Sequence, residues 1–354
     1  MKIGIDIRST LKKKTGIGKY TLNLINALAR VDSDNSYYLY SRKKILDFKR
    51  RLPKLPGANF SHCRVLRDLD VFHTSSYDLE KPKKAKYIVT IHDVIIKAYP
   101  HGHSEQTIKE VDEKLKRVLG EADVLVADSY NTKADLVKFY GVGEKRITVI
   151  YPGVNVRDPV PVASLRYGAG KGNGEYILFV GTLEPRKNVE GVIKAFDWLK
   201  KEYGIKHKLY IVGMKGWMFE NIFKVYEASE FKNDIIFKGY VDDGELDRLY
   251  RQATLFVYPS FYEGFGFPVI EAFSYGLPVV TSRTSSCGEI GKDSALLVDP
   301  ANYKDIGERI LKILNSEDLQ KELANRGIDR AKEFSWDRTA KEFLKLITST
   351  CSTS

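Results

Sequence analysis

Residues 262–273, Y-E-G-F-G-F-P-V-I-E-A-F, hold two glutamates, two glycines and a proline in an order that could bind a phosphorylated ligand. The apolar run Leu255–Tyr258 before them predicts a buried strand, and Pro268 is typical of the first turn of a helix. A helix that begins there directs unpaired backbone N–H groups and the positive end of its dipole toward the preceding loop, which favours an anion such as phosphate. Gly264 and Gly266 would let that ligand approach the main chain closely.

The two glutamates of this stretch are Glu263 in the loop and Glu271 in the predicted helix. Their spacing would let one carboxylate reach the front of a ligand and the other its middle. Carboxylates that accept from vicinal hydroxyls are suited to a sugar or a ribose. The residues alone also allow a plainer interpretation, because a strand, a glycine-rich loop and a helix recur in α/β proteins and two glutamates can simply face water.

Basic and histidine side chains follow two other predicted strands. Arg186 and Lys187 lie just before a predicted helix, where Arg can bind phosphate bidentately and Lys acts as a point charge. His92 directly follows the strand predicted over residues 87–91, at the end of a parallel strand, where ligands bind in open α/β sheets. Two solvated charges and a histidine that caps a loop are the alternatives.

Two glycine-containing turns are less specific indications of a binding site. Gly16 and Gly18 follow the first predicted strand and precede a helix, as in a nucleotide-binding opening, but the six-residue dinucleotide fingerprint is absent. Gly239, Tyr240 and Val241 follow another predicted strand. A tight turn would explain either set.

The elements that must position these residues alternate between strand and helix, which predicts parallel sheets. Strands are expected at residues 2–7, 37–40, 71–72, 87–91, 122–127, 147–150, 176–180, 209–213, 235–237, 255–258 and 277–281. Helices are expected around residues 22–29, 105–120, 189–200, 303–314 and 319–334 and from 335 onward. Two further helices are expected, one that carries Leu136, Val137 and Tyr140 with its cap at Asn131 or Thr132, and one that contains Leu246, Leu249 and Tyr250 with its cap at Asp243. Asn188 is the predicted cap of the helix at 189–200.

Length and composition limit the class of protein. The 354 residues are enough for two domains with their own cores, and a linker rich in Pro and Gly is predicted over residues 156–175. No apolar run approaches the length of a membrane span, and the start of the chain predicts a strand rather than a signal peptide. Cys63, Cys287 and Cys351 form no metal or disulfide pattern, which suits a reducing cytoplasm.

The net charge of +11 is unevenly distributed. Residues 1–160 hold 30 basic and 19 acidic residues, whereas the remainder holds 27 of each. The excess lies mainly in four runs, at residues 12–14, 42–44, 49–51 and 81–86. A basic half could face anionic lipid, an anionic acceptor or nucleic acid, or it could be an ordinary solvated surface.

The pattern E-G-F-G-F-P-V-I-E-A, followed by G-L-P-V-V-T-S and A-L-L-V-D-P, resembles the signature of retaining glycosyltransferases of family 4. The resemblance implies an α/β protein of the GT-B fold, with two Rossmann-like domains facing each other across a deep cleft. It places an acceptor-binding domain at 1–160, a nucleotide-sugar-binding domain at 161–335 and a terminal helix, 336–354, that crosses back to the first domain.

The same resemblance implies roles for individual residues. Glu271 would hold the ribose hydroxyls and Glu263 those of the donor sugar, while Arg186 and Lys187 would stabilise the leaving diphosphate and His92 would contact the sugar. The remaining binding positions would be the N–H groups at Gly264, Phe265, Gly266 and Phe267, the pair Gly16 and Gly18 at the donor diphosphate and the acceptor, and Gly239, Tyr240 and Val241 at the nucleobase.

The implied activity is metal-independent transfer of a hexose from a nucleoside diphosphate sugar, with no prosthetic group. The run G-T-L-E-P-R-K-N resembles members that use GDP-mannose, so mannose is the first expectation and a UDP-sugar the second. A lipid-linked or glycan acceptor is expected, with the protein in the cytoplasm and in peripheral contact with an anionic membrane surface. No nucleic-acid-binding motif is present. A sugar-nucleotide epimerase of the same fold and a non-catalytic nucleotide-binding regulator are the alternatives.

Overall fold

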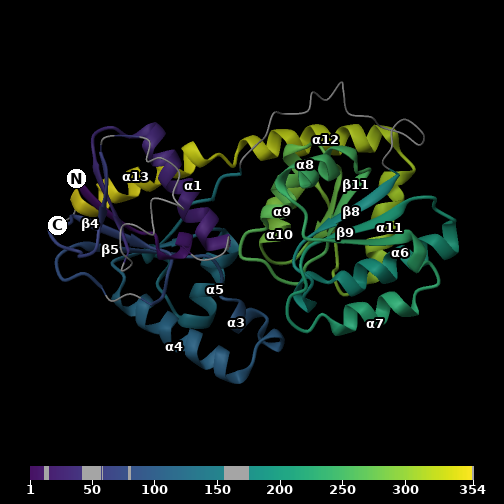
Figure 1. Ribbon diagram of the computed structural model, residues 1–354, viewed down its shortest axis with the longest axis horizontal. Coiled ribbons are helices and arrows are strands. Elements are labelled where there is room, and N and C mark those ends of the chain that lie inside the picture. The colour runs from purple at the N-terminus through teal and green to yellow at the C-terminus, as the bar shows by residue number, and fades with distance from the viewer. Residues whose placement is uncertain (12–15, 42–56, 58, 79–80, 155–174, 353–354) are drawn as a thin grey trace. The chain divides into compact units, whose positions relative to one another are not determined.

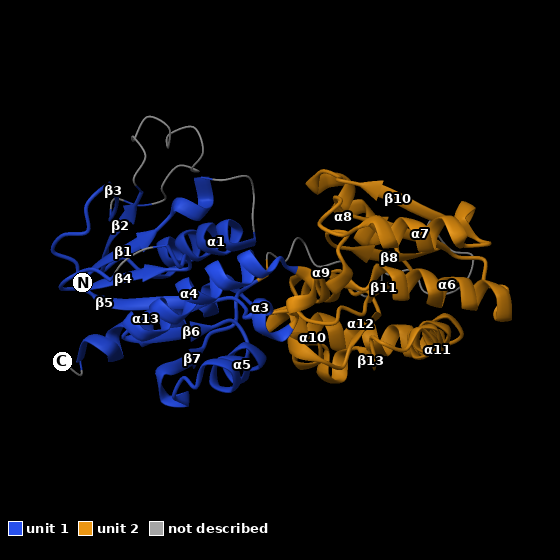
Figure 2. Ribbon diagram, turned by 90° about the horizontal axis from the view of Figure 1, so that it is seen from below, with its two compact units in different colours: residues 1–98, 103–153, 334–354 blue, residues 99–102, 154–333 orange. Residues whose placement is uncertain are grey.

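The computed structural model describes residues 1–11, 16–41, 57, 59–78, 81–154 and 175–352. The chain forms two compact units: unit 1 holds residues 1–98, 103–153 and 334–354, and unit 2 holds residues 99–102 and 154–333 (Figure 2). Each unit contains one parallel sheet, which confirms the prediction of two α/β halves.

The sheet of unit 1 has seven strands in the order β3-β2-β1-β4-β5-β6-β7, and all neighbouring strands are parallel. Its strands are β1 (Lys2–Asp6), β2 (Ser36–Tyr40), β3 (Phe60–Cys63), β4 (Val71–Thr74), β5 (Lys86–Ile91), β6 (Val124–Ala127) and β7 (Ile147–Val149). β4 and β5 are almost entirely buried, as expected for strands covered on both faces. The edge strand β3 was not predicted, because F-S-H-C contains too few apolar residues to signal a strand.

Helices flank this sheet, and the C-terminal helix α13 packs on α1 (Figure 1). The helices of the first half and the C-terminal helix are η1 (Arg8–Leu11), α1 (Gly16–Val31), α3 (Ile95–Ala98), η2 (Pro100–Gly102), α4 (Glu105–Glu121), α5 (Tyr130–Tyr140), η3 (Glu144–Arg146) and α13 (Trp336–Ser352). On α1, Leu24, Ile25 and Leu28 recur at helical spacing and are buried, so one apolar face holds the helix in place.

The sheet of unit 2 has six parallel strands in the order β10-β9-β8-β11-β12-β13. Its strands are β8 (Tyr176–Val180), β9 (Lys208–Val212), β10 (Ile235–Gly239), β11 (Leu255–Tyr258), β12 (Val279–Ser282) and β13 (Leu296–Val298). Its helices are η5 (Pro185–Lys187), α6 (Val189–Tyr203), α7 (Glu220–Ala228), η6 (Lys232–Asp234), α8 (Asp243–Gln252), α9 (Phe267–Ser274), α10 (Ser285–Gly291), η7 (Lys292–Ser294), α11 (Tyr303–Leu314) and α12 (Glu317–Lys332).

The helix caps correct two of the sequence predictions. Ser129, not Asn131 or Thr132, caps α5, because its extended backbone lets its Oγ accept from the N–H of Thr132. Asp242, not Asp243, caps α8 in the same way. Asn188 caps α6 as predicted and accepts from the Gly191 N–H at 3.2 Å.

Several sequence features fall outside the described residues. The basic runs 12–14, 42–44 and 49–51 lie there, as does the predicted linker 156–175 apart from residue 175. Within the described residues, no helix is both long and apolar enough to cross a membrane. The three cysteines are free thiols.

Candidate active site

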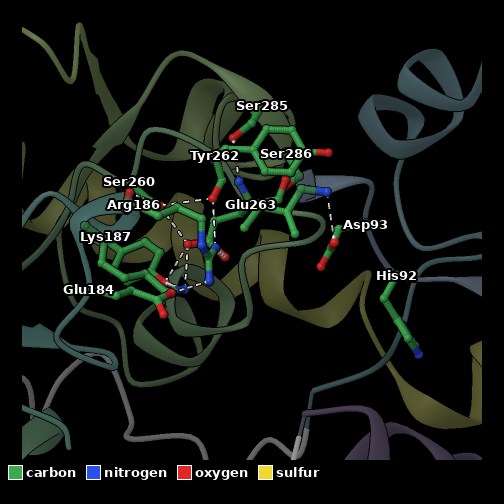
Figure 3. Close-up of polar contacts among 12 residues, drawn as sticks. His92, Asp93, Glu184, Arg186, Lys187, Ser260, Tyr262, Glu263, Ser285 and Ser286 are labelled. Carbon is green, nitrogen blue, oxygen red and sulfur yellow. Dashed lines mark hydrogen bonds and ion pairs between the residues drawn. The ribbon is translucent and has the colours of Figure 1, made fainter. Parts of the chain in front are cut away.

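The strand order of unit 2 indicates where a ligand would bind. β8 lies between β9 and β11, so the connections after β8 and β11 leave in opposite directions along the sheet. In open α/β sheets, ligands bind at the carboxyl ends of the strands at such a switch point. The loop after β8 contains Arg186 and Lys187, and the loop after β11 contains Glu263, so this topology brings the three predicted residues together (Figure 3).

Lys187 and Glu263 form the centre of this site. Lys187 Nζ lies 2.6 Å from Glu263 Oε1, and the two residues are only 9% and 7% exposed. Tyr258 donates from its hydroxyl to the same oxygen at 2.9 Å, and Ser260 donates at 2.7 Å. Lys187 Nζ also lies 2.5 Å from the Tyr258 hydroxyl. The lysine is therefore held at a fixed position on the carboxylate.

Arg186 binds the second oxygen of the same carboxylate. Its Nη1 lies 2.7 Å from Glu263 Oε2 and donates to the Tyr262 carbonyl at 2.8 Å, while its Nη2 lies 2.5 Å from Glu184 Oε1. Two cations and two carboxylates thus form one cluster in which the formal charges cancel.

The sequence predicted three of the four charged residues of this cluster but not their mutual ion pairs. It missed Glu184, Tyr258 and Ser260. The place of Tyr258 and Ser260 at the carboxyl end of a strand predicted as buried was the signal that could have identified them.

The electrostatics of Glu263 follow from these partners. Burial would raise the pKa of its carboxyl, but the charges of Arg186 and Lys187 and the hydrogen bonds from Lys187 and Ser260 outweigh it and lower the pKa to about 2. Burial similarly disfavours the charged form of Arg186, and the Glu263 and Glu184 carboxylates reverse this and raise its pKa. Glu263 is therefore ionised at neutral pH.

The main chain around Glu263 is held by the first turn of α10. Ser285, with a φ of +54°, accepts from the Glu263 N–H at 3.1 Å. Ser286 donates to the Glu263 carbonyl at 2.8 Å. Residues other than glycine rarely adopt the left-handed backbone conformation, and here the surrounding contacts hold Ser285 in it.

The glycine turn leads into α9 as predicted. Gly266 precedes the helix with a φ of +101°, a conformation that favours glycine, and it has no side chain with which to cap the first turn. Phe265 is buried and packs edge-to-face on Phe267, which fixes the loop. The start of α9 therefore follows the charged cluster by a few residues, with its dipole oriented to favour an anion.

Glu271 is half-buried on α9. The hydroxyl of Tyr250, a fully buried residue of α8, lies 3.3 Å from Glu271 Oε2. Tyr250 in turn stacks on Tyr275, with ring centroids 4.9 Å apart. The sequence did not identify Tyr250 as a neighbour of the predicted ribose-binding residue.

The remaining predicted residues of unit 2 lie at the edge of the sheet. Gly239 ends β10 with a φ of +65°, and its carbonyl accepts from the Gly213 N–H at 2.9 Å. Tyr240 is 69% exposed, and Val241 is half-buried. Because β9 and β8 separate β10 from β11, these residues are not part of the charged cluster.

In unit 1, His92 follows β5 as predicted and forms a pair that the sequence did not reveal. Its Nδ1 lies 2.6 Å from Asp128 Oδ2, which follows the neighbouring strand β6. His73, the other strand-end histidine, is buried in β4 with its Nε2 2.8 Å from the Thr90 hydroxyl. Gly16 and Gly18 lie in the first turn of α1, where Gly16 is exposed and Gly18 is buried.

Two α/β units, each with a parallel sheet, are the architecture of the GT-B fold. Residues 15–158 match the family model described as Glycosyltransferase Family 4, and residues 167–330 match the model described as Glycosyl transferases group 1. Since the two models together span most of the chain, the protein belongs to this family of glycosyltransferases.

Individual relatives are consistent with this family. The chain is 29% identical over 358 residues to O-antigen chain mannosyltransferase B of Escherichia coli, an alignment that covers 91% of this chain and 93% of the relative. Sucrose-phosphate synthase from Thermosynechococcus elongatus has a similar structure, with a TM-score of 0.77 at 20% identity over 100% of both chains. Anabaena HepE in complex with UDP-glucose gives a TM-score of 0.72 at 16% identity, over 99% of this chain and 100% of HepE. These structural likenesses show the fold.

Proposed function

We propose that the protein is a metal-independent mannosyltransferase that takes mannose from GDP-mannose and transfers it, with retention of the anomeric configuration, to a lipid-linked or glycan acceptor. Two features support mannose: the G-T-L-E-P-R-K-N run at residues 181–188 and the similarity to a protein named as a mannosyltransferase. A UDP-sugar is the alternative donor. The family models describe transferases, so the alternative of an epimerase has no support.

The observation that carries this proposal is the cluster of Arg186, Lys187 and Glu263 next to the start of α9. Breaking the bond between sugar and diphosphate leaves negative charge on the diphosphate and positive charge on the anomeric carbon. Cations and helix N–H groups held on the leaving-group side stabilise that charge as it develops, and one such contact contributes about 2.7–4 kcal/mol. The two cations are already positioned at this site by their contacts with Glu263 and Glu184.

The other residues each bind a different part of the donor. Glu263 accepts from hydroxyls of the sugar, Glu271 accepts from the ribose hydroxyls, and the N–H groups of residues 264–267 bind sugar and phosphate. Residues 239–241 bind the nucleobase, and His92 contacts the transferred sugar. Gly16 and Gly18 lie against the diphosphate and the acceptor.

Retention is explained by a front-face reaction. The acceptor oxygen attacks the anomeric carbon on the side from which the diphosphate leaves. The new bond between carbon and the acceptor oxygen forms as the carbon–phosphate oxygen bond breaks, and the departing phosphate oxygen takes the acceptor's proton. Arg186 and Lys187 lower the energy of this step by neutralising the leaving group, so no metal is required.

We assign the acceptor to unit 1 and the donor mainly to unit 2. The basic excess of residues 1–160 supports an anionic or lipid-linked acceptor and peripheral contact with the inner face of a membrane from the cytoplasm. Vesicle flotation with and without anionic lipid tests that contact.

A donor panel tests the proposed activity. Thermal unfolding with GDP, UDP and ADP identifies the nucleotide, because a ligand that binds the folded state raises the unfolding temperature. Transfer from GDP-mannose and from UDP-sugars to lipid-linked acceptors then identifies the reaction, and NMR of the product gives its anomeric configuration. Stabilisation by UDP alone would refute the assignment of GDP-mannose, and an inverted product would refute the front-face reaction.

A further inference from the structure

The pair formed by His92 and Asp128 has a fixed geometry that the sequence motifs do not assign. Ile91 and Ala127 are register partners on the adjacent strands β5 and β6, so the residue after each emerges at the same edge of the sheet. His92 Nδ1 and Asp128 Oδ2 are 2.6 Å apart, and Asp128 is 1% exposed. Because water barely reaches this carboxylate, breaking the pair would leave a buried charge without a partner.

The orientation of His92 is fixed by further contacts. The ring of Tyr20, from α1, packs against the imidazole edge-to-face with centroids 4.8 Å apart. Thr132, in the first turn of α5, donates to the His92 carbonyl at 3.4 Å. With Nδ1 directed at Asp128, the imidazole has only Nε2 left for another partner.

His92 Nε2 is buried and has no hydrogen-bond partner among the described residues. Leaving a buried polar group unpaired destabilises the folded protein. Such a cost is understandable at a binding site, where the substrate supplies the missing partner.

The surrounding charges favour a protonated imidazole. Burial by itself would lower the pKa of His92, but the charge and hydrogen bond of Asp128 and the charge of Asp93 outweigh burial and raise it. Tyr20 and Tyr77 are neutral, because burial and nearby carboxylates raise the pKa of both phenols well above the usual value.

The neighbouring histidine behaves in the opposite way. Burial, with a smaller contribution from His92, lowers the pKa of His73 to about 3, so His73 stays neutral. The pKa values of the two neighbouring histidines are therefore shifted in opposite directions.

We propose that Asp128 is a positioning residue that holds His92 as an imidazolium, so that His92 donates its Nε2–H to an oxygen of the bound sugar nucleotide instead of accepting a proton from the acceptor. This inference rests on the proposed function, which puts His92 against the donor sugar. A charge-assisted hydrogen bond of this kind is about twice as strong as a neutral one. It requires no net proton transfer, consistent with a reaction in which the leaving phosphate takes the proton.

The first test follows the six histidines of the complete, ligand-free protein by NMR titration, with His92 assigned from the signal lost in His92→Asn. We expect His92 to titrate above its usual value and to titrate lower in Asp128→Asn. A titration that Asp128→Asn leaves unchanged would overturn the proposal. This measurement does not depend on enzyme activity.

The second test is the pH dependence of kcat/KM. We expect activity to fall as pH rises through the pKa of His92, and the same limb to move to lower pH in Asp128→Asn. At pH values above the falling limbs of both profiles, each pH unit by which the limb moves lowers kcat/KM of the variant about tenfold relative to the wild type. Asp128→Glu should restore part of the wild-type profile. The wild-type profile is informative even if Asp128→Asn folds poorly.

Asp112→Asn is the matched control, because Asp112 is a buried carboxylate of unit 1 that pairs with Lys97 and Lys116 and is not among the charges that shift the pKa of His92. It should lower stability without moving the pH limb. A wild-type activity that rises with pH through the pKa of His92 would identify a general base and overturn the proposal. Unchanged kcat/KM in His92→Asn would also overturn it, while transfer from the donor panel would still support the proposed glycosyl transfer.

Discussion

Replacing Lys187 with methionine tests whether this cation acts on the leaving diphosphate. Lys187 is 9% exposed, and its Nζ lies 2.6 Å from Glu263 Oε1. Methionine keeps most of the apolar stem and removes the charge. If Nζ stabilises charge that develops on the diphosphate, kcat should fall by about 10²–10³-fold, which corresponds to about 2.7–4 kcal/mol.

The same substitution removes an ion pair from a buried cluster, so stability must be measured beside activity. Removing one partner of a buried pair costs about 3–5 kcal/mol because the other charge is left uncompensated. Arg186, whose Nη1 lies 2.7 Å from Glu263 Oε2 in the unsubstituted protein, still compensates the carboxylate, so we expect a loss of stability at or below the lower end of that range. The double variant Lys187→Met, Glu263→Gln removes both charges and should recover part of the free energy of unfolding but no turnover.

Lys200→Met is the matched control for this experiment. Lys200 is a lysine of unit 2 whose side chain is 8% exposed and whose Nζ lies 2.7 Å from Asp234 Oδ2. Denaturant unfolding and steady-state kinetics are measured for both lysine variants. If Lys187→Met lost stability but kept normal kcat, the lysine would be structural only, and the assignment of the leaving-group site would be wrong.

Four further predictions concern the same unit. Glu263 has a folded pKa of about 2 and an ordinary pKa of 4.5, so its contribution to stability is present above about pH 4.5 and is lost as pH falls toward 2; the unfolding free energy of Glu263→Gln should vary less over that range. Glu263→Gln also leaves the cluster with a net positive charge, so calorimetry should show tighter binding of free GDP, whereas mannosyl transfer should fall at least ~100-fold, the effect of losing one transition-state contact. Tyr250→Phe removes the hydroxyl beside Glu271 and should weaken binding of GDP more than that of 2′-deoxy-GDP, and equal losses would argue against contact between Glu271 and the ribose. Turnover should survive EDTA, and a loss that Mg²⁺ or Mn²⁺ restores would contradict a metal-independent reaction.

Features set by local chemistry were predictable from the sequence, whereas pairings set by strand order were not. Pro268 marked the start of α9 and Asn188 the cap of α6, because a helix start depends on a few adjacent residues. The contact between Lys187 and Glu263 joins residues 76 positions apart and depends on β8 lying beside β11. The pair of His92 and Asp128 depends on adjacent strands in the same way, so the sequence alone did not point to Asp128.

Both sheets place charged side chains at their switch points, but the two arrangements differ in what they could bind. In unit 1, Asp6 at the end of β1 binds Arg8 at 2.9 Å and accepts from the Thr74 hydroxyl at the end of β4 at 2.8 Å, so one cation is balanced by the carboxylate two residues before it in the chain.

In unit 2, the carboxylate and the cations come from different loops, two cations share Glu263, and a helix begins three residues beyond Gly264. A ligand that offers hydroxyls to Glu263 and phosphate oxygens to Arg186 and Lys187 can replace both halves of this cluster at once, whereas a simple anion must compete with Glu263 for the cations. A switch point alone is common to both units. Unit 2 is the suitable place for a sugar diphosphate because its carboxylate and its cations come from different loops and a helix starts beside them.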